Sequence, residues 1–197
     1  MKMQKAEVTK ALYDTCAFAV VRVETVERGL EIADGLLRGG VPAMEISYTL
    51  PNAGEVISGI QDRFGDEMLV GAGTVLTTEQ VDEAMAAGAQ FIVTPGMDPD
   101  IVAYCQKVGI QIFPGCTTPT DYHTAYKLGL EVLKFFPAEQ SGGISLKNLA
   151  DYVKNPVIAA CGGSYMVTAD LIEGGKWDEI TDLCKQSVEI VKAARNG

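Results

Sequence analysis

Four stretches of this chain share one arrangement, in which a helical pattern ends at glycine and an apolar strand begins one or two residues later. They read LLRGGVPAMEI (residues 36–46), AMAAGAQFIV (84–93), CQKVGIQIF (105–113) and YKLGLEVLKF (126–135). Glycine is favoured where helices end, and strands that are apolar along their whole length are typical of a parallel sheet covered on both faces. The repeat therefore predicts helices and strands that alternate around a buried parallel sheet.

The same patterns extend over the rest of the chain. We expect strands at Phe18–Arg22, Ala43–Ser47, Leu69–Gly73, Phe91–Thr94, Gln111–Phe113, Val132–Phe136 and Val157–Ala160. We expect helices at residues 3–15, Val26–Arg38, Thr78–Ala87, Pro99–Val108, Thr118–Leu128 and Leu146–Val153. No GxGxxG fingerprint follows the first strand, which favours a (β/α)₈ barrel over an open doubly wound sheet. The prediction is one α/β barrel domain over residues 1–197.

The pattern of the expected strands is incomplete for such a barrel. After Lys134 the next strand is expected only at Val157, with one helix between them. The 197 residues also fall just under the lower limit of roughly 200 that is usual for this fold. The sequence therefore indicates that about one αβ unit is absent.

Composition narrows the classes of function. A net charge of −10 argues against nucleic acid and anionic membranes as partners, although a phosphorylated small molecule needs only local donors. Five cysteines without CxxC spacing and a single histidine argue against a disulfide framework and a metal site. The N-terminus lacks the apolar stretch of a signal peptide, and no run approaches the length of a membrane span. We therefore expect a reduced, cytoplasmic protein without a metal.

Two charged residues lie inside strands that should be apolar. They are Glu45 in AMEIS and Lys134 in VLKFFP, and both lie toward the strand ends where barrels hold their active sites. Each could instead belong to a structural ion pair or extend to the rim. Burial would lower the pKa of the amine toward neutrality and raise that of the carboxyl, while their attraction opposes both shifts. Together they predict an amine nucleophile and a general base.

Smaller polar residues follow other strands. Thr74 comes after two glycines that let a ligand approach the backbone, while Thr94 and Thr118 are equally consistent with turn and cap chemistry. Arg22 ends the first strand, where it could bind a carboxylate or phosphate or simply lie at the surface. Gly162, Gly163 and Ser164 follow the last strand, where barrels often place a phosphate, although glycines there also serve as plain turns.

Six motifs resemble one family in order over nearly the whole chain. They are GGVPAMEIS (39–47), VGAGTVLTTEQ (70–80), AGAQFIVTPG (87–96), FPGCTTPTD (113–121), LKFFPAE (133–139) and CGGSYMV (161–167). The sequence resembles the 2-keto-3-deoxy-6-phosphogluconate (KDPG) aldolases, which include the 4-hydroxy-2-oxoglutarate (KHG) aldolases. These are class I aldolases on a (β/α)₈ barrel, usually trimeric and without a cofactor. They release pyruvate together with glyceraldehyde 3-phosphate or glyoxylate.

The resemblance implies a role for individual residues. Lys134 would form a Schiff base with a 2-oxo acid, and Glu45 would transfer protons. Residues of the substrate site would be Arg22, Thr49, Thr74, Pro95, Thr117 and Phe136. Gly162, Gly163 and Ser164 would form part of the phosphate site.

The chain departs from the family pattern at two places. Thr49 stands where many members have an arginine for the pyruvate carboxylate, which leaves the preferred substrate open. At Gly143–Ile144 about one αβ unit is missing, including the seventh strand and half of the phosphate site. Three explanations stay open. The protein contains the unit and only the printed sequence omits it, the unit was removed by engineering, or it was lost naturally.

Two other functions stay open at this point. A phosphate-binding barrel isomerase or epimerase could use Glu45 as a base without imine chemistry. A barrel reused as a non-enzymatic scaffold would keep the core and have no cleavage activity.

Overall fold

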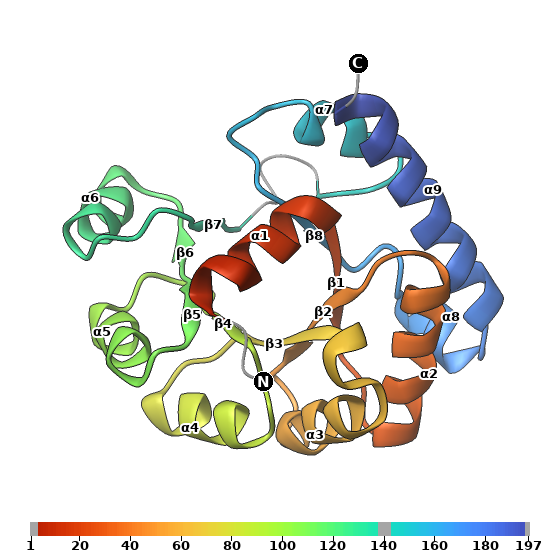
Figure 1. Cartoon of the computed structure of the whole chain (residues 1–197), viewed down its shortest axis with the longest axis horizontal. Coiled ribbons are helices and arrows are strands. Elements are labelled where there is room, and N and C mark those ends of the chain that lie inside the picture. The colour runs from red at the N-terminus through yellow and green to blue at the C-terminus, as the bar shows by residue number, and fades with distance from the viewer. Residues whose placement is uncertain (1–3, 138–142, 196–197) are drawn as a thin grey trace.

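A curved sheet of parallel strands forms the centre of the computed structural model, which describes residues 4–137 and 143–195 (Figure 1). Its six strands lie in the order β5-β4-β3-β2-β1-β8. Their bounds are β1 (Ala17–Val21), β2 (Ala43–Ser47), β3 (Leu69–Gly73), β4 (Phe91–Val93), β5 (Gln111–Phe113) and β8 (Cys161–Gly163). A second parallel pair consists of β6 (Gly115–Cys116) and β7 (Lys134–Phe135). The two sheets are linked where the Gly115 amide donates to the Thr94 carbonyl at 3.1 Å.

Helices surround the sheet, as the ring of coiled ribbons in Figure 1 shows. They are α1 (Lys5–Thr15), α2 (Val26–Arg38), α3 (Ala53–Phe64), the short 3₁₀ helix η1 (Gly65–Glu67), α4 (Thr78–Ala86), α5 (Pro99–Val108), α6 (Pro119–Lys127), α7 (Leu149–Val153), α8 (Ala169–Glu173) and α9 (Trp177–Arg195). Side chains of Thr25, Thr77, Asp98 and Thr118 cap α2, α4, α5 and α6 by accepting backbone N–H groups of the first turn. No helix among the described residues is long and apolar enough to cross a membrane.

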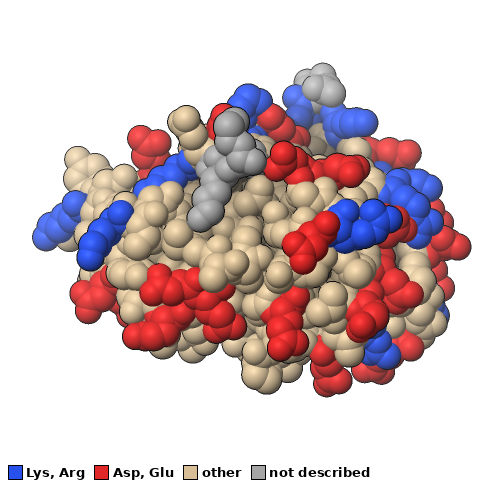
Figure 2. Space-filling model, turned by 60° about the horizontal axis from the view of Figure 1, so that its bottom comes forward, with Lys and Arg blue, Asp and Glu red and all other residues tan. Residues whose placement is uncertain are grey.

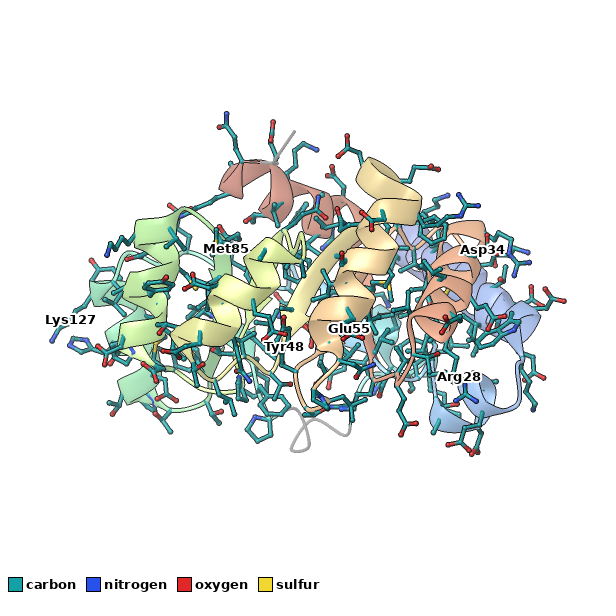
Figure 3. All side chains as sticks on the ribbon, turned by 90° about the horizontal axis from the view of Figure 1, so that it is seen from below. Arg28, Asp34, Tyr48, Glu55, Met85 and Lys127 are labelled. Carbon is teal, nitrogen blue, oxygen red and sulfur yellow. The ribbon has the colours of Figure 1, made fainter. Side chains whose placement is uncertain are left out.

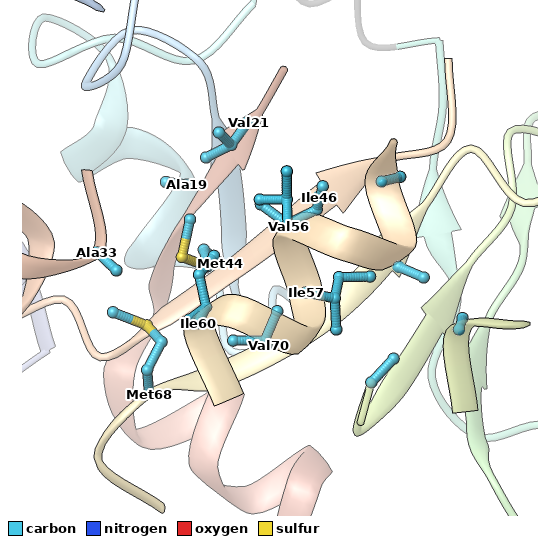
Figure 4. Close-up of a cluster of buried hydrophobic side chains, with 14 of the residues drawn as sticks. Ala19, Val21, Ala33, Met44, Ile46, Val56, Ile57, Ile60, Met68 and Val70 are labelled. Carbon is cyan, nitrogen blue, oxygen red and sulfur yellow. The ribbon is translucent and has the colours of Figure 1, made fainter. Parts of the chain in front are cut away.

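The alternation of side chains along β2 separates the core from the barrel interior. Met44 and Ile46 point outward and pack with buried residues of α2 and α3, such as Ala33 and Ile57, in the cluster shown in Figure 4. Each such side chain contributes about 1.5–3 kcal/mol through burial. Because strand residues alternate between faces, Ala43, Glu45 and Ser47 point to the other side, into the barrel.

Helix α1 closes the end of the barrel where the strands begin. Its Val8 and Leu12 are buried against Ala43, Leu69 and Phe91, the first residues of three strands. Figure 1 shows α1 crossing in front of the strands. With this end covered, the carboxyl ends of the strands remain for a site.

The barrel is open between β7 and β8. In the described part of the chain β7 pairs with β6 alone and β8 with β1 alone. Beyond the junction, Leu149 and Val153 of α7 pack with Cys161 of β8 and Val191 of α9 in a small separate core. The prediction of a (β/α)₈-type barrel that lacks about one αβ unit at Gly143–Ile144 is confirmed.

The predicted bounds agree with the structure for β2, β3, β5, α2 and α5. Helix α1 begins at Lys5, whereas the helix is expected from residue 3: Gln4 is the N-cap, and residue 3 is outside the described residues. The prediction of a strand at Val157–Ala160 is wrong, because β8 begins only at Cys161. Val157 is 84% exposed, and its amide donates to the Asn155 side chain in a turn. The Arg195 guanidinium donates hydrogen bonds to the carbonyls of Ile158 and Ala159, so these carbonyls do not pair with a strand.

Acidic side chains are spread over the face shown in Figure 2, in keeping with the net charge of −10.

Candidate active site

Glu45 lies in the middle of β2 with its side chain inside the barrel, where it is 1% exposed. Two glycines of the neighbouring strand make room there. A Cβ on Gly73 would approach the Glu45 carboxylate to 2.7 Å, and one on Gly71 would approach the Phe91 ring to 2.2 Å. The sequence GAG in β3 is therefore required by the side chains of β2 and β4 that fill the barrel.

The environment of Glu45 sets its charge state. Burial raises the pKa of its carboxyl, and the positive charges of Lys134 and Arg22 oppose that rise. Its Oε2 atom is buried and has no hydrogen-bond partner among the described residues. An unpaired buried polar atom costs about 1–3 kcal/mol, and such atoms are found where a ligand or water completes the site. Glu45 thus has the environment of a proton-transfer group.

Lys134 opens β7 at the edge of the gap in the barrel. Its backbone amide donates to the Pro114 carbonyl at 3.0 Å, which holds the strand beside β6. Its Nζ lies 4.6 Å from the centroid of the Phe136 ring, in the range of a cation–π interaction. The side chain is half-buried rather than enclosed, and among the described residues β7 pairs only with β6.

Three hydroxyl groups meet at the ends of β2 and β3. Ser47 Oγ donates to Thr74 Oγ1 at 3.1 Å and lies 3.2 Å from Thr49 Oγ1. Thr74 has φ +59°, which is a rare conformation for a β-branched residue and costs about 1–3 kcal/mol. Strained residues of this kind cluster at functional sites.

The remaining predicted substrate residues lie at neighbouring strand ends. Arg22 is exposed directly after β1, and its charge reaches Glu45. The Thr117 hydroxyl donates to the Phe136 carbonyl, which ties the residues after β6 to those after β7. Pro95 lies close to Gly115, because a Cβ on residue 115 would come within 2.2 Å of the Pro95 carbonyl oxygen. Residues 138 and 139, which complete the LKFFPAE motif, lie outside the described residues.

Gly162, Gly163 and Ser164 lie at the end of β8, next to β1. A Cβ on Gly162 would meet the Phe18 ring at 2.6 Å, and one on Gly163 would meet the Tyr165 ring at 2.6 Å. Packing alone therefore explains why both positions are glycine. Ser164 is exposed, and its carbonyl accepts from the Val167 amide at 3.0 Å in the turn before α8.

Three residues of interest escaped the sequence reading. Ser47 could have been found, because it lies two residues after Glu45 and so shares its face. The importance of Gly73 could be recognised only from the register between β2 and β3. Tyr48 packs in the outer layer near α3 and α4 (Figure 3), where burial raises the pKa of its phenol, and its hydroxyl has no hydrogen-bond partner among the described residues. Within the same described ranges, no cluster of three or more His, Cys, Asp or Glu could hold a metal ion.

Known proteins share both the sequence and the fold. The model of the family "Aldolase: KDPG and KHG aldolase" matches residues 8–150 and 140–183, two segments that overlap at residues 140–150, around the Gly143–Ile144 junction. A 2-dehydro-3-deoxy-phosphogluconate aldolase of Treponema pallidum is 40% identical over 203 positions, covering 92% of this chain and 96% of the relative. Because this alignment is longer than the 197 residues of the chain, the relative contains residues that have no counterpart here.

Two solved structures are similar over nearly their whole length. The KDPG aldolase of Zymomonas mobilis with 3-phosphoglycerate has a TM-score of 0.86 and 28% identity, covering 96% of this chain and 99% of the other. The KDPG aldolase of Legionella pneumophila, with pyruvate captured as a covalent carbinolamine intermediate, has a TM-score of 0.84 and 29% identity, with coverage of 94% and 98%.

Proposed function

The chain belongs to the KDPG and KHG aldolase family, and on that premise we propose that it is a class I aldolase. It cleaves 2-keto-3-deoxy-6-phosphogluconate or 4-hydroxy-2-oxoglutarate to pyruvate and an aldehyde, which is glyceraldehyde 3-phosphate or glyoxylate. The observation that carries this proposal is the buried Glu45 carboxylate inside the barrel, whose Oε2 has no hydrogen-bond partner among the described residues, together with Lys134 on β7 of the same barrel. The covalent pyruvate carbinolamine of the Legionella relative supports the same chemistry.

The two catalytic residues divide the reaction between them. The neutral Lys134 amine attacks the C2 ketone, and the resulting carbinolamine loses water to form a cationic imine. Glu45, through a water molecule, removes the proton of the C4 hydroxyl. The C3–C4 bond breaks, its electron pair moves into the imine, and the aldehyde leaves. The enamine that remains is protonated at C3 and hydrolysed to pyruvate, which restores the amine.

The other residues hold the substrate. Around the 2-oxo acid lie Arg22, Thr49, Thr74, Pro95, Thr117 and Phe136. Arg22 supplies positive charge for the carboxylate, and Thr74 supplies a hydroxyl donor. Gly162, Gly163 and Ser164 supply amides and a hydroxyl for a phosphate, next to the gap where the chain lacks the unit before β8. No metal or organic cofactor takes part.

The protein is a cytoplasmic enzyme that acts on a small-molecule substrate. Its single domain spans residues 1–197, and three copies form a homotrimer, as is usual in the family. Sedimentation of the purified chain measures the number of copies, and a monomer would contradict the trimer.

Borohydride trapping tests the proposed activity. Pyruvate and borohydride together should add one reduced pyruvate to the intact mass, and peptide mapping should place it on Lys134. Cleavage of KDPG and of KHG, followed through pyruvate release, gives the substrate preference. Isomerisation of a sugar phosphate without an adduct would indicate a barrel isomerase, and the absence of both adduct and turnover would indicate a non-enzymatic scaffold.

A further inference from the structure

Ser47 occupies an unusual place for a small polar residue. It is the last residue of β2, on the same face as Glu45, and it is only 1% exposed. Both of its side-chain contacts are with other hydroxyls, those of Thr74 and Thr49. Its Cα pairs in register with Gly73, the residue before Thr74. Ser47 therefore lies between two residues proposed to surround the substrate, while it is itself shielded from solvent.

The direction of these hydrogen bonds follows from counting protons. A serine hydroxyl has one proton and two lone pairs. Ser47 Oγ donates its proton to Thr74 Oγ1 at 3.1 Å, so the 3.2 Å contact with Thr49 Oγ1 is made with the proton of Thr49. The hydrogen bonds of the described residues use Thr74 Oγ1 only as an acceptor. The proton of Thr74 is therefore left for an acceptor that the described residues do not provide.

The backbone holds Thr74 in place on both sides. The Tyr48 amide donates to the Gly73 carbonyl at 2.7 Å, and the Val75 amide donates to the Val93 carbonyl at 3.2 Å. Between these two bonds Thr74 has φ +59°, so its side chain leaves the strand in a direction that an extended residue would not take. With the backbone held, rotation about χ1 is the main freedom left to the Thr74 hydroxyl, and the bond from Ser47 restricts it.

We infer that Ser47 is a positioning residue, which aligns the Thr74 hydroxyl as a hydrogen-bond donor to the carboxylate of the 2-oxo acid. The inference rests on the proposed function and adds a specific part to its binding site. All hydrogen bonds of this chain of hydroxyls are donated in one direction. Thr49 donates to Ser47, Ser47 donates to Thr74, and Thr74 donates to the substrate. Each bond polarises the next, so Thr74 becomes a stronger donor than an isolated hydroxyl. Thr49 then acts as the outer end of this chain.

A double-mutant cycle on the full chain tests the inference. The measured quantity is the pyruvate concentration that half-saturates borohydride trapping on Lys134, together with the trapping rate at saturation. Ser47→Ala should raise the half-saturating concentration about tenfold, as expected for one lost hydrogen bond, and change the saturated rate less than about twofold. Thr74→Val, which keeps the side-chain shape, should raise it at least as much. The double variant should be no worse than Thr74→Val, because Ser47 acts through Thr74.

Ser187→Ala is the matched control. Ser187 is fully buried on α9, where its hydroxyl contacts Tyr165 and the Leu183 carbonyl, and removing it should leave half-saturation unchanged. If Ser47→Ala does not fold, Ser47→Cys keeps the size with a much weaker donor and should shift half-saturation in the same direction. An unchanged half-saturation in the Ser47 variants, or additive effects in the double variant, overturns the inference. Absence of an adduct in the unmodified chain would instead refute the proposed aldolase itself.

Discussion

The carboxylate of Glu45 lies directly over Gly73, so close that a Cβ at residue 73 would come within 2.7 Å of Oε1 and 2.9 Å of Cδ. Gly73 thus packs directly against the proposed proton-transfer group, and its lack of a side chain leaves room for that group. Its backbone φ is not in the left-handed region, so an alanine there strains only the contact with Glu45.

Gly73→Ala should therefore leave the fold intact and displace the carboxylate, because the end of a glutamate side chain moves more easily than two paired strands. We expect kcat for aldol cleavage to fall about 100-fold, the loss that a displacement of about 1 Å can cause. Gly96→Ala is the control, since nothing lies within 4 Å of a Cβ at that position. Equal kcat values in the Gly73 variant and the unmodified chain would contradict the assigned contact.

Glu45→Gln should separate activity from stability. Loss of the general base lowers kcat by about 10²–10⁴-fold. Burial raises the pKa of Glu45 above 4.5, so between pH 4.5 and that raised value the native state keeps a proton that the unfolded chain has released. The stability of the unmodified chain therefore falls as pH rises through this window, and the variant lacks that fall. Chemical denaturation from pH 4 to 8 measures the free energy of unfolding of both proteins. The same dependence of this free energy on pH in the variant and in the unmodified chain would argue against a buried, proton-binding Glu45.

Lys134→Arg should abolish the pyruvate adduct without unfolding the protein. The guanidinium keeps the positive charge near Glu45 and can still lie over the Phe136 ring, but it stays protonated and cannot attack a ketone. We expect no borohydride adduct, no cleavage and a Tm close to that of the unmodified chain. Lys127→Arg on α6 is the control and should behave as the unmodified chain does. A remaining adduct on another lysine would contradict the assignment.

Asp121→Ala should weaken the turn between β6 and α6. The Asp121 carboxylate accepts the amides of Thr118 and Thr117, and these bonds lower its pKa below 3.8. Its contribution to stability is therefore present above pH 3.8 and is lost as pH falls through the lowered pKa. We expect a lower Tm for the variant at pH 7 and a difference that narrows below pH 3.8. Because Thr117 is tied to the Phe136 carbonyl, KM should also rise. A constant difference in Tm at every pH would count against the cap.

The five cysteines should resist thiol reagents in the folded protein. All are free and buried, and burial raises the pKa of Cys105 and Cys184 to about 12 and that of Cys116 and Cys161 to about 11. Since the thiolate is the reactive form, we expect almost no reaction with a disulfide reagent at pH 8 and five equivalents after denaturation. Rapid labelling of the native chain would show that a cysteine opens to solvent.

The sequence determined the parts of this protein that depend on local patterns. The glycine-to-strand repeat placed β2 and β5 at their observed bounds, and the same apolar pattern placed β3, because burial on both faces demands an unbroken apolar run. The same rule made Glu45 and Lys134 conspicuous, since a charge in such a run needs a reason. The count of seven expected strands in 197 residues also indicated the missing unit, because a closed barrel of this type has eight βα units.

Contacts between residues that are distant in sequence became evident only in the folded protein. Val157–Ala160 has the residue types of a strand, but within the described part of the chain no strand lies between β7 and β8, and the Ile158 and Ala159 carbonyls accept hydrogen bonds from Arg195 instead. The need for glycine at position 73 appears only when the register brings β3 beside Glu45. Ser47 can position Thr74 only because the fold brings Thr74, 27 residues away, within hydrogen-bond distance of it. Propensity and periodicity act within one element, whereas these contacts depend on how the strands are aligned with one another.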